Sequence, residues 1–271
     1  MRRFHIDSTV IAAALGAPAI SPDPGKPGPG HSEGPVVPLS PGDANHVRNV
    51  LRLKPGDRVR LFDGRGREYD ARITAVSADD VRVSVTEASA PDTESPLAIT
   101  IAQGFLKEKK MDDLIRQLTE LGISRWIPFL AERSVARPDP GRLRARKARW
   151  EKIAAESLKQ CRRSRIPEIG DTLSFEEMLA ASTGQDLQIL FWEKASDPSR
   201  DLFSLAEAKP YGTVFAVLGP EGGLSDAEVD AAVAAGFEVA ALGPRILRAE
   251  TATVSACALL QYFLGDLGKN P

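Results

Sequence analysis

The sequence predicts an α/β protein with a β-rich front domain over residues 1–90 and a second domain over residues 97–271 built on a parallel sheet. First, polar and apolar residues alternate between residues 57 and 85, as in half-buried strands. Second, from residue 97 onward apolar runs alternate with helical stretches, which is typical of a parallel sheet covered on both faces. Third, the segment Ala90–Pro96 has the composition of a linker.

In the front domain, the alternating run Asp57–Phe62 is followed by the turn signal Asp63-Gly64 and by two further alternating runs, through Ile73 and over Val81–Val85. These runs predict a small β-barrel or curled sheet. Residues 17–41 are rich in proline and glycine, so we expect a flexible surface loop without strand or helix there.

The second domain is expected to contain regularly alternating elements. Ser225 and Glu228 stand at the spacing of a capping box, which predicts a helix start there. The expected strands are Leu97–Ile101, Trp126–Leu130, Leu187–Trp192, Thr213–Leu218 and Phe237–Leu242, and the expected helices are Lys110–Leu121, Arg142–Gln160, Ser225–Ala235 and Ala249–Leu267.

The composition narrows the class of protein. With 271 residues, 42% of them hydrophobic, the chain can bury a sizeable core. No apolar run approaches the roughly 20 residues that cross a bilayer, and the first residues lack the pattern of a signal peptide, so we expect a cytoplasmic protein without a membrane partner. Two cysteines and three scattered histidines lack metal-ligand spacing, and we therefore predict no metal.

Basic residues gather between Arg133 and Arg165, although the net charge of the chain is only −2. The acidic residues of this stretch are Asp139, Glu151 and Glu156. Such a stretch indicates either a solvated surface or a polyanionic partner. The basic residues are Arg133, Arg137, Arg142, Arg144, Arg146, Lys147, Arg149, Lys152, Lys159, Arg162, Arg163 and Arg165.

Two predicted strands end in glycine-bearing loops, Leu218–Leu224 and Leu242–Arg245. Ligands of parallel α/β sheets bind at the carboxyl ends of strands, where small residues let the backbone approach them, so these loops indicate a pocket. For one such loop alone, a simple turn between strand and helix is the more common explanation. The spacing fits neither a P-loop nor a dinucleotide motif.

The carboxyl-terminal segment gives a closer resemblance, which rests on LGPEGGLSDAEVDAAVAAGFEVAALGPRILRAETATVSACALLQ. It resembles the ribosomal RNA small-subunit methyltransferase E family of the SPOUT superfamily, which methylates N3 of a uridine in 16S ribosomal RNA. The similarity extends over nearly the whole chain. It implies a PUA-like front domain, a catalytic domain with a trefoil knot, S-adenosylmethionine as cofactor, and a homodimer.

The resemblance also implies functional residues. Arg248 and Glu250 are the candidate catalytic pair, and the alternative is a structural ion pair at a helix start. The family's cofactor-binding positions fall on Leu190, Glu193, Leu218, Gly219, Glu221, Gly222, Gly223, Leu242, Gly243, Arg245, Leu247, Arg248, Thr251 and Ala252. RNA contacts are expected from Asn45, His46, Arg48, Arg52, Arg133, Arg163 and Arg165.

Two questions stay open at this level. The first is whether Arg163 and Arg165 complete the site of a partner subunit or lie at a solvated helix end. In the same segment, Arg162 stands where the family has a small residue. The alternatives to a base methyltransferase are a SPOUT 2′-O-ribose methyltransferase and a non-catalytic RNA-binding or ribosome-assembly protein.

Overall fold

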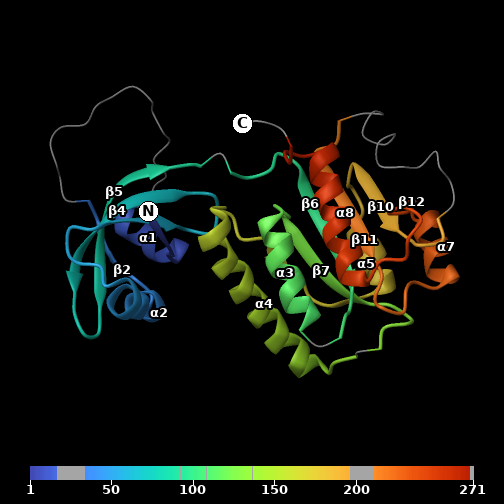
Figure 1. The fold of residues 1–271 in the computed structure, drawn as a ribbon, viewed down its shortest axis with the longest axis horizontal. Helices are drawn as coiled ribbons and strands as arrows, with labels where there is room; N and C mark the ends of the chain where they lie inside the picture. Colours follow the sequence, from blue (N-terminus) through green and yellow to red (C-terminus); the bar gives the residue numbers. More distant parts are fainter. Residues whose placement is uncertain (17–33, 92, 108, 136, 196–209, 269–271) are drawn as a thin grey trace. The chain divides into compact units, whose positions relative to one another are not determined.

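The computed structural model describes residues 1–16, 34–91, 93–107, 109–135, 137–195 and 210–268. The chain divides into two compact units (Figure 1). The front unit contains Met1–Glu94 together with Lys159–Arg165, and the second unit contains Ser95–Leu158 and Ile166–Pro271. The boundary between the two units falls between Glu94 and Ser95. The prediction that all of residues 97–271 form one domain is wrong for Lys159–Arg165, which belongs to the front unit.

The front unit is a five-stranded sheet with strand order β1-β3-β4-β5-β2. Strand β1 runs parallel to β3, and the other neighbours are antiparallel. The alternating runs of the sequence place residues such as Val59, Leu61 and Val83 in its core. The elements are β1 (Arg2–His5), α1 (Ser8–Leu15), β2 (Val36–Pro38), α2 (Pro41–Asn45), the π-helix η1 (His46–Leu51), β3 (Arg58–Phe62), β4 (Glu68–Val76) and β5 (Val81–Ser89).

The expectation of an unstructured loop over residues 17–41 is wrong in its last part. Val36–Pro38 forms β2, which pairs with β5, and α2 starts at Pro41. Proline fits both places, because β2 is an edge strand and the first helical position needs no N–H donor. The side chain of Ser40 caps α2 by accepting a hydrogen bond from the Asp43 N–H. Residues 17–33 lie outside the described part of the chain.

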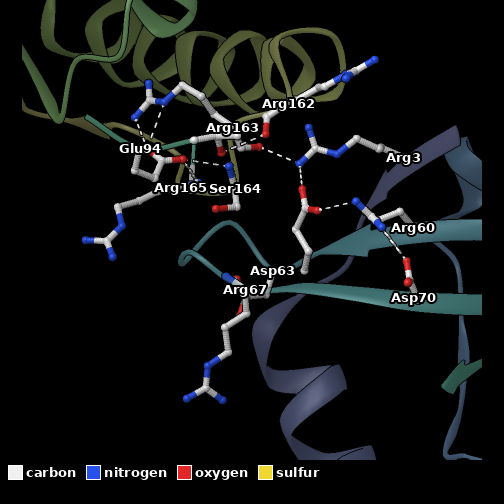
Figure 2. Close-up of polar contacts among 12 residues, drawn as sticks. Arg3, Arg60, Asp63, Arg67, Asp70, Glu94, Arg162, Arg163, Ser164 and Arg165 are labelled. Carbon is white, nitrogen blue, oxygen red and sulfur yellow. Dashed lines mark hydrogen bonds and ion pairs between the residues drawn. The ribbon is translucent and has the colours of Figure 1, made fainter. Parts of the chain in front are cut away.

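Hydrogen bonds and ion pairs of charged side chains hold the segment Lys159–Arg165 in the front unit (Figure 2). The Glu94 carboxylate accepts hydrogen bonds from the N–H groups of Ser164 and Arg165, at 2.8 and 3.0 Å, and from the Arg163 guanidinium. Only 5% of the Arg163 side chain is exposed. Arg3 donates to the Arg163 carbonyl and is ion-paired with Glu68. The end of this segment is therefore part of the fold of the front unit.

The second unit contains a seven-stranded sheet in which every recorded pairing is parallel, so the predicted α/β architecture is confirmed. The strand order is β12-β10-β11-β6-β7-β8, with β9 also paired to β7. The elements are β6 (Ala98–Gly104), α3 (Lys110–Glu120), β7 (Arg125–Leu130), α4 (Pro140–Cys161), β8 (Glu168–Ile169), β9 (Leu173–Ser174), α5 (Phe175–Ala181), β10 (Leu187–Phe191), β11 (Thr213–Leu218), α7 (Asp226–Ala234), β12 (Glu238–Ala240) and α8 (Ala249–Phe263).

Helices cover both faces of this sheet, and the strand residues alternate between them (Figure 1). On one face, Ala216 and Leu218 pack with residues of α3, α4 and α8. On the other face, Phe215 and Val217 pack with residues of α5 and α7. The predicted capping box of α7 is present, formed by Ser225 and Glu228. Within the described residues, no helix has the length and apolar character needed to cross a membrane.

Some elements differ from the expectation. Helix α8 ends at Phe263 instead of Leu267, and the short elements α1, η1, β8, β9 and α5 were not expected. Arg162 has φ +65°, a left-handed conformation that costs a residue with a side chain about 1 kcal/mol or more. This conformation favours glycine at position 162 over residues that carry a Cβ.

The Glu94–Arg163 pair gives a test of how the front unit is closed. Glu94→Gln keeps the shape of the side chain but leaves a buried guanidinium without its counter-charge, and we expect it to destabilise the front unit by about 3 kcal/mol. Hydrogen exchange of β3–β5 amides measures this loss as faster exchange. Glu87→Gln, an exposed position on β5, is the control. Equal exchange in the two variants would contradict a structural role of the pair.

Candidate functional site

A cleft of about 510 Å³ opens in the second unit at the carboxyl ends of β10, β11 and β12. Its walls are the three segments that follow these strands and the first turn of α8. This is the place where parallel α/β sheets bind ligands. The lining residues are Lys110, Phe191, Trp192, Glu193, Leu218, Gly219, Pro220, Glu221, Gly222, Gly223, Leu224, Leu242, Gly243, Arg245, Ile246, Leu247, Arg248, Ala249, Glu250 and Ala252.

The structure gathers most of the predicted cofactor-binding residues and both candidate catalytic residues at this cleft. Leu190 and Thr251 are absent from its lining. Leu190 is fully buried and packs on the face covered by α5 and α7, because successive residues of a strand point to opposite faces. Its side chain therefore does not line the cleft, and the next residues, Phe191 to Glu193, form that wall. The assignment of Leu190 to the cofactor stays a prediction. Thr251 is exposed on the first turn of α8.

The buried side chain of Gln103, at the end of β6, joins the parts of the cleft. Its oxygen accepts a hydrogen bond of 2.6 Å from the Thr253 hydroxyl on α8, and its amide nitrogen donates to the Gly219 carbonyl at 3.1 Å. Gln103 has no exposed surface. A buried amide of this kind is stable only while its partners remain in place, so it fixes the loop after β11 against α8.

The loop after β11 also lies very close to the backbone at the end of β6. A Cβ added to Gly104 would lie 2.5 Å from the nitrogen of Pro220, closer than atoms can pack. Glycine at the end of β6 is therefore required for the loop 219–224 to sit where it does.

Lys110, the first residue of α3, lies between two carboxylates of the cleft. Its ammonium group is 3.2 Å from Glu221 and 3.3 Å from Glu250. The hydrogen bond to Glu221 raises the pKa of Lys110, with a further contribution from Glu250. Partial burial alone would raise the pKa of Glu221, but hydrogen bonds from the Lys107 N–H and from Lys110 lower it below its ordinary value. The Lys110–Glu221 pair thus stays ionised on both sides of neutral pH.

Lys110 was not predicted from the sequence. It follows β6, which is the neighbour of β11 in the sheet, so its place at the same edge depends on strand order. The ion pair recorded for Glu250 is with Lys110, whereas Arg248 is exposed at the N-cap of α8. Glu250 is thus paired with Lys110 and not, as the expected alternative had it, with Arg248.

The residues expected to contact RNA separate into distinct groups. Asn45, His46 and Arg52 are exposed at α2, η1 and the residue after η1, and Arg48 donates a hydrogen bond to the Ser77 carbonyl. These residues belong to the front unit.

Arg133, Arg163 and Arg165 differ from one another in burial. Arg133 is exposed in the second unit and donates to the Leu224 carbonyl at 3.3 Å. Arg165 is exposed in the front unit, but the Arg163 guanidinium is buried against Glu94. The structure thus gives Arg163 a structural contact in place of the predicted RNA contact or solvated helix end. Among the described residues, no group of His, Cys, Asp and Glu is arranged to hold a metal ion.

Comparison with known proteins agrees with this fold and cleft. Residues 93–261 match the model of the RNA methyltransferase domain, and residues 39–86 match that of the RNA methyltransferase PUA domain. The class is therefore that of RNA methyltransferases with a PUA-like front domain and a parallel-sheet methyltransferase domain, as predicted. The trefoil knot stays a prediction.

Sequence identity to individual proteins shows the family to which this chain belongs. The chain is 34% identical to ribosomal RNA small subunit methyltransferase E of Bacillus subtilis, over 85% of this chain and 91% of that protein. The protein of the same name from Synechocystis is 31% identical, over 84% and 74% of the two chains. The crystal structure of that enzyme from Neisseria gonorrhoeae, bound to S-adenosyl methionine, has a TM-score of 0.79 and 28% identity, covering 98% of this chain and 99% of the other. This chain belongs to the ribosomal RNA small subunit methyltransferase E family.

The Gln103–Thr253 contact gives a test of how the cleft is held. Thr253→Val keeps the volume of the side chain but leaves a buried amide oxygen without its donor, and we expect a loss of about 2 kcal/mol in the free energy of unfolding. Urea denaturation followed by fluorescence of the buried Trp126 and Trp150 measures it. The same substitution at the exposed Thr251 is the control, with an expected change below about 0.5 kcal/mol. Equal losses would show that the buried contact contributes nothing specific.

Proposed function

We propose that this protein transfers a methyl group from S-adenosylmethionine to N3 of a specific uridine in 16S ribosomal RNA. The observation that carries the proposal is the cleft at the ends of β10–β12, whose walls are the two glycine-bearing loops. Family membership supports the reaction class, and the resemblance described above supports the nucleotide. The proposal includes a cytoplasmic homodimer that acts on the small ribosomal subunit.

The residues of the cleft fit the cofactor. Gly243 lines it with no atom within 4 Å of the place where a Cβ would stand, so the backbone of this loop is open to a ligand. Leu218, Leu242 and Leu247 supply apolar surface for an adenine ring. The carboxylate of Glu193 supplies negative charge for a cationic ligand, whereas the charge of Glu221 is compensated by Lys110. The volume of the cleft lies in the range of small-molecule sites.

The chemistry required of the chain is modest. The bound cofactor supplies an electrophilic methyl group, so the protein must orient the uracil ring and manage the N3 proton. Loss of that proton spreads negative charge over the two ring carbonyls, which the exposed guanidinium of Arg248 stabilises. The carboxylate of Glu250 accepts the proton, and Lys110 holds this carboxylate in position.

Substitution of the two candidate catalytic residues tests their roles. We expect Arg248→Ala and Glu250→Ala each to lower the rate of methyl transfer by about 100-fold or more, because each removes a group needed for proton transfer or charge stabilisation. Methyl transfer at saturating cofactor and cofactor affinity by calorimetry are measured in parallel. Unchanged turnover would exclude a catalytic role, and a loss confined to affinity would assign the residues to cofactor binding.

The proposed reaction itself is tested in cells with and without this protein. Mass-spectrometric mapping of modified nucleosides in ribosomal RNA should show loss of 3-methyluridine from 16S ribosomal RNA and of no other modification. Loss of a 2′-O-methylated nucleotide would favour the ribose methyltransferase. An unchanged pattern, together with no binding of S-adenosylmethionine at millimolar concentration, would favour a non-catalytic RNA-binding protein.

A further inference from the structure

Two arginines that are far apart in the sequence face each other in the front unit. The turn between β3 and β4 forms an antiparallel bridge with the segment after α4, and in this bridge Arg65 is opposite Arg165. The Gly66 N–H donates a hydrogen bond of 3.1 Å to the Ser164 carbonyl, which holds the two segments together. Figure 2 shows the side chain of Arg165 extending away from the ion pairs of the network.

The bridge places the backbones of two cationic residues directly opposite each other. Residues directly opposite in an antiparallel pair have Cβ atoms about 5 Å apart on the same face, and like charges at this distance destabilise the pairing. The Arg165 side chain is held next to the turn, because its Nη2 atom lies 3.2 Å from the place of a Cβ on Gly66. Gly66 has φ +106°, so the turn needs glycine in any case.

Among the described residues, no carboxylate is ion-paired with either of these two arginines. Asp63 accepts hydrogen bonds from the N–H groups of Arg65 and Arg67, and the oxygens of Glu94 are occupied by Arg163 and by backbone N–H groups. Throughout the part of the chain that the structure describes, neither Arg65 nor Arg165 has an ion pair. Both residues are exposed, and so is Arg67 in the same turn.

We propose that Arg65 and Arg165 form a clamp for the phosphodiester backbone of RNA, with Arg67 as a flanking contact. A phosphate carries enough acceptor oxygens to receive both guanidinium groups, and its charge cancels the repulsion between them. The turn between β3 and β4 thereby becomes an RNA contact separate from Asn45, His46 and Arg52. This inference rests on the proposed RNA substrate and specifies where the front unit holds it.

The experiment compares Arg65→Gln, Arg165→Gln and the double variant of the full-length protein. Affinity for a 16S ribosomal RNA transcript is measured at several salt concentrations. We expect each single variant to bind roughly fivefold more weakly and to lower the salt dependence by about one phosphate contact. The double variant should lose less than the product of the two, because both guanidinium groups contact the same phosphate.

Stability separates a clamp from a structural contact. Removal of one arginine relieves repulsion, so hydrogen exchange of the front unit should stay unchanged or become slower in both single variants. Faster exchange in parallel with weaker binding would overturn the clamp. Arg58 and Arg72, which are also opposite each other across β3 and β4, give the matched controls Arg58→Gln and Arg72→Gln. Equal loss of affinity in these controls would show a general effect of charge and would likewise overturn it.

The proposed function and the clamp fail in different ways. Wild-type methylation of 16S ribosomal RNA with full affinity in the Arg65 and Arg165 variants would overturn the clamp alone. A wild-type protein that binds this transcript no more tightly than an unrelated RNA of equal length, and does not methylate it, would overturn both.

Discussion

The cleft depends on one buried side-chain amide. Gln103 hydrogen-bonds to the loop after β11 and to α8, two segments that must meet although about thirty residues separate them. Burial raises the free-energy penalty for losing either partner, because no water replaces it. The loop after β11 can therefore vary little in position relative to α8. A rigid loop and helix start place Arg248 and Glu250 at a fixed distance from whatever the cleft holds.

Lys110 adds an electrostatic connection to this frame. One ammonium group lies between Glu221 on the loop and Glu250 on α8. The loop and α8 are therefore joined once through the buried amide of Gln103 on β6 and once through ion pairs with Lys110 on α3. The two connections differ in solvent contact. The amide is insensitive to salt, whereas the partly exposed ion pairs weaken as ionic strength rises.

The sequence predicted the second unit well because its strands are long, apolar and regularly separated by helices. The sequence could not predict features that depend on a shift of a single residue along a strand. Leu190 and Phe191 are both apolar. Which of them faces the cleft depends on the face of the sheet to which each side chain points, and the sequence alone does not determine that face. Lys110 could not be predicted, because α3 reaches the site through the order of the strands in the sheet. Strand order leaves no periodic pattern in the sequence. The two-residue strands β8 and β9 are too short for any pattern to register.

The front unit is discontinuous along the chain, since Lys159–Arg165 completes it only after much of the second unit has been made. During synthesis from the amino terminus, β1 to β5 leave the ribosome first. Glu94 can pair with Arg163 only after the 69 residues that follow it have been translated, and Arg3, which can already pair with Glu68, gains its contact with the Arg163 carbonyl at the same time. Folding of the first domain is thus completed by a later part of the polypeptide, and the order of synthesis couples the maturation of the two units.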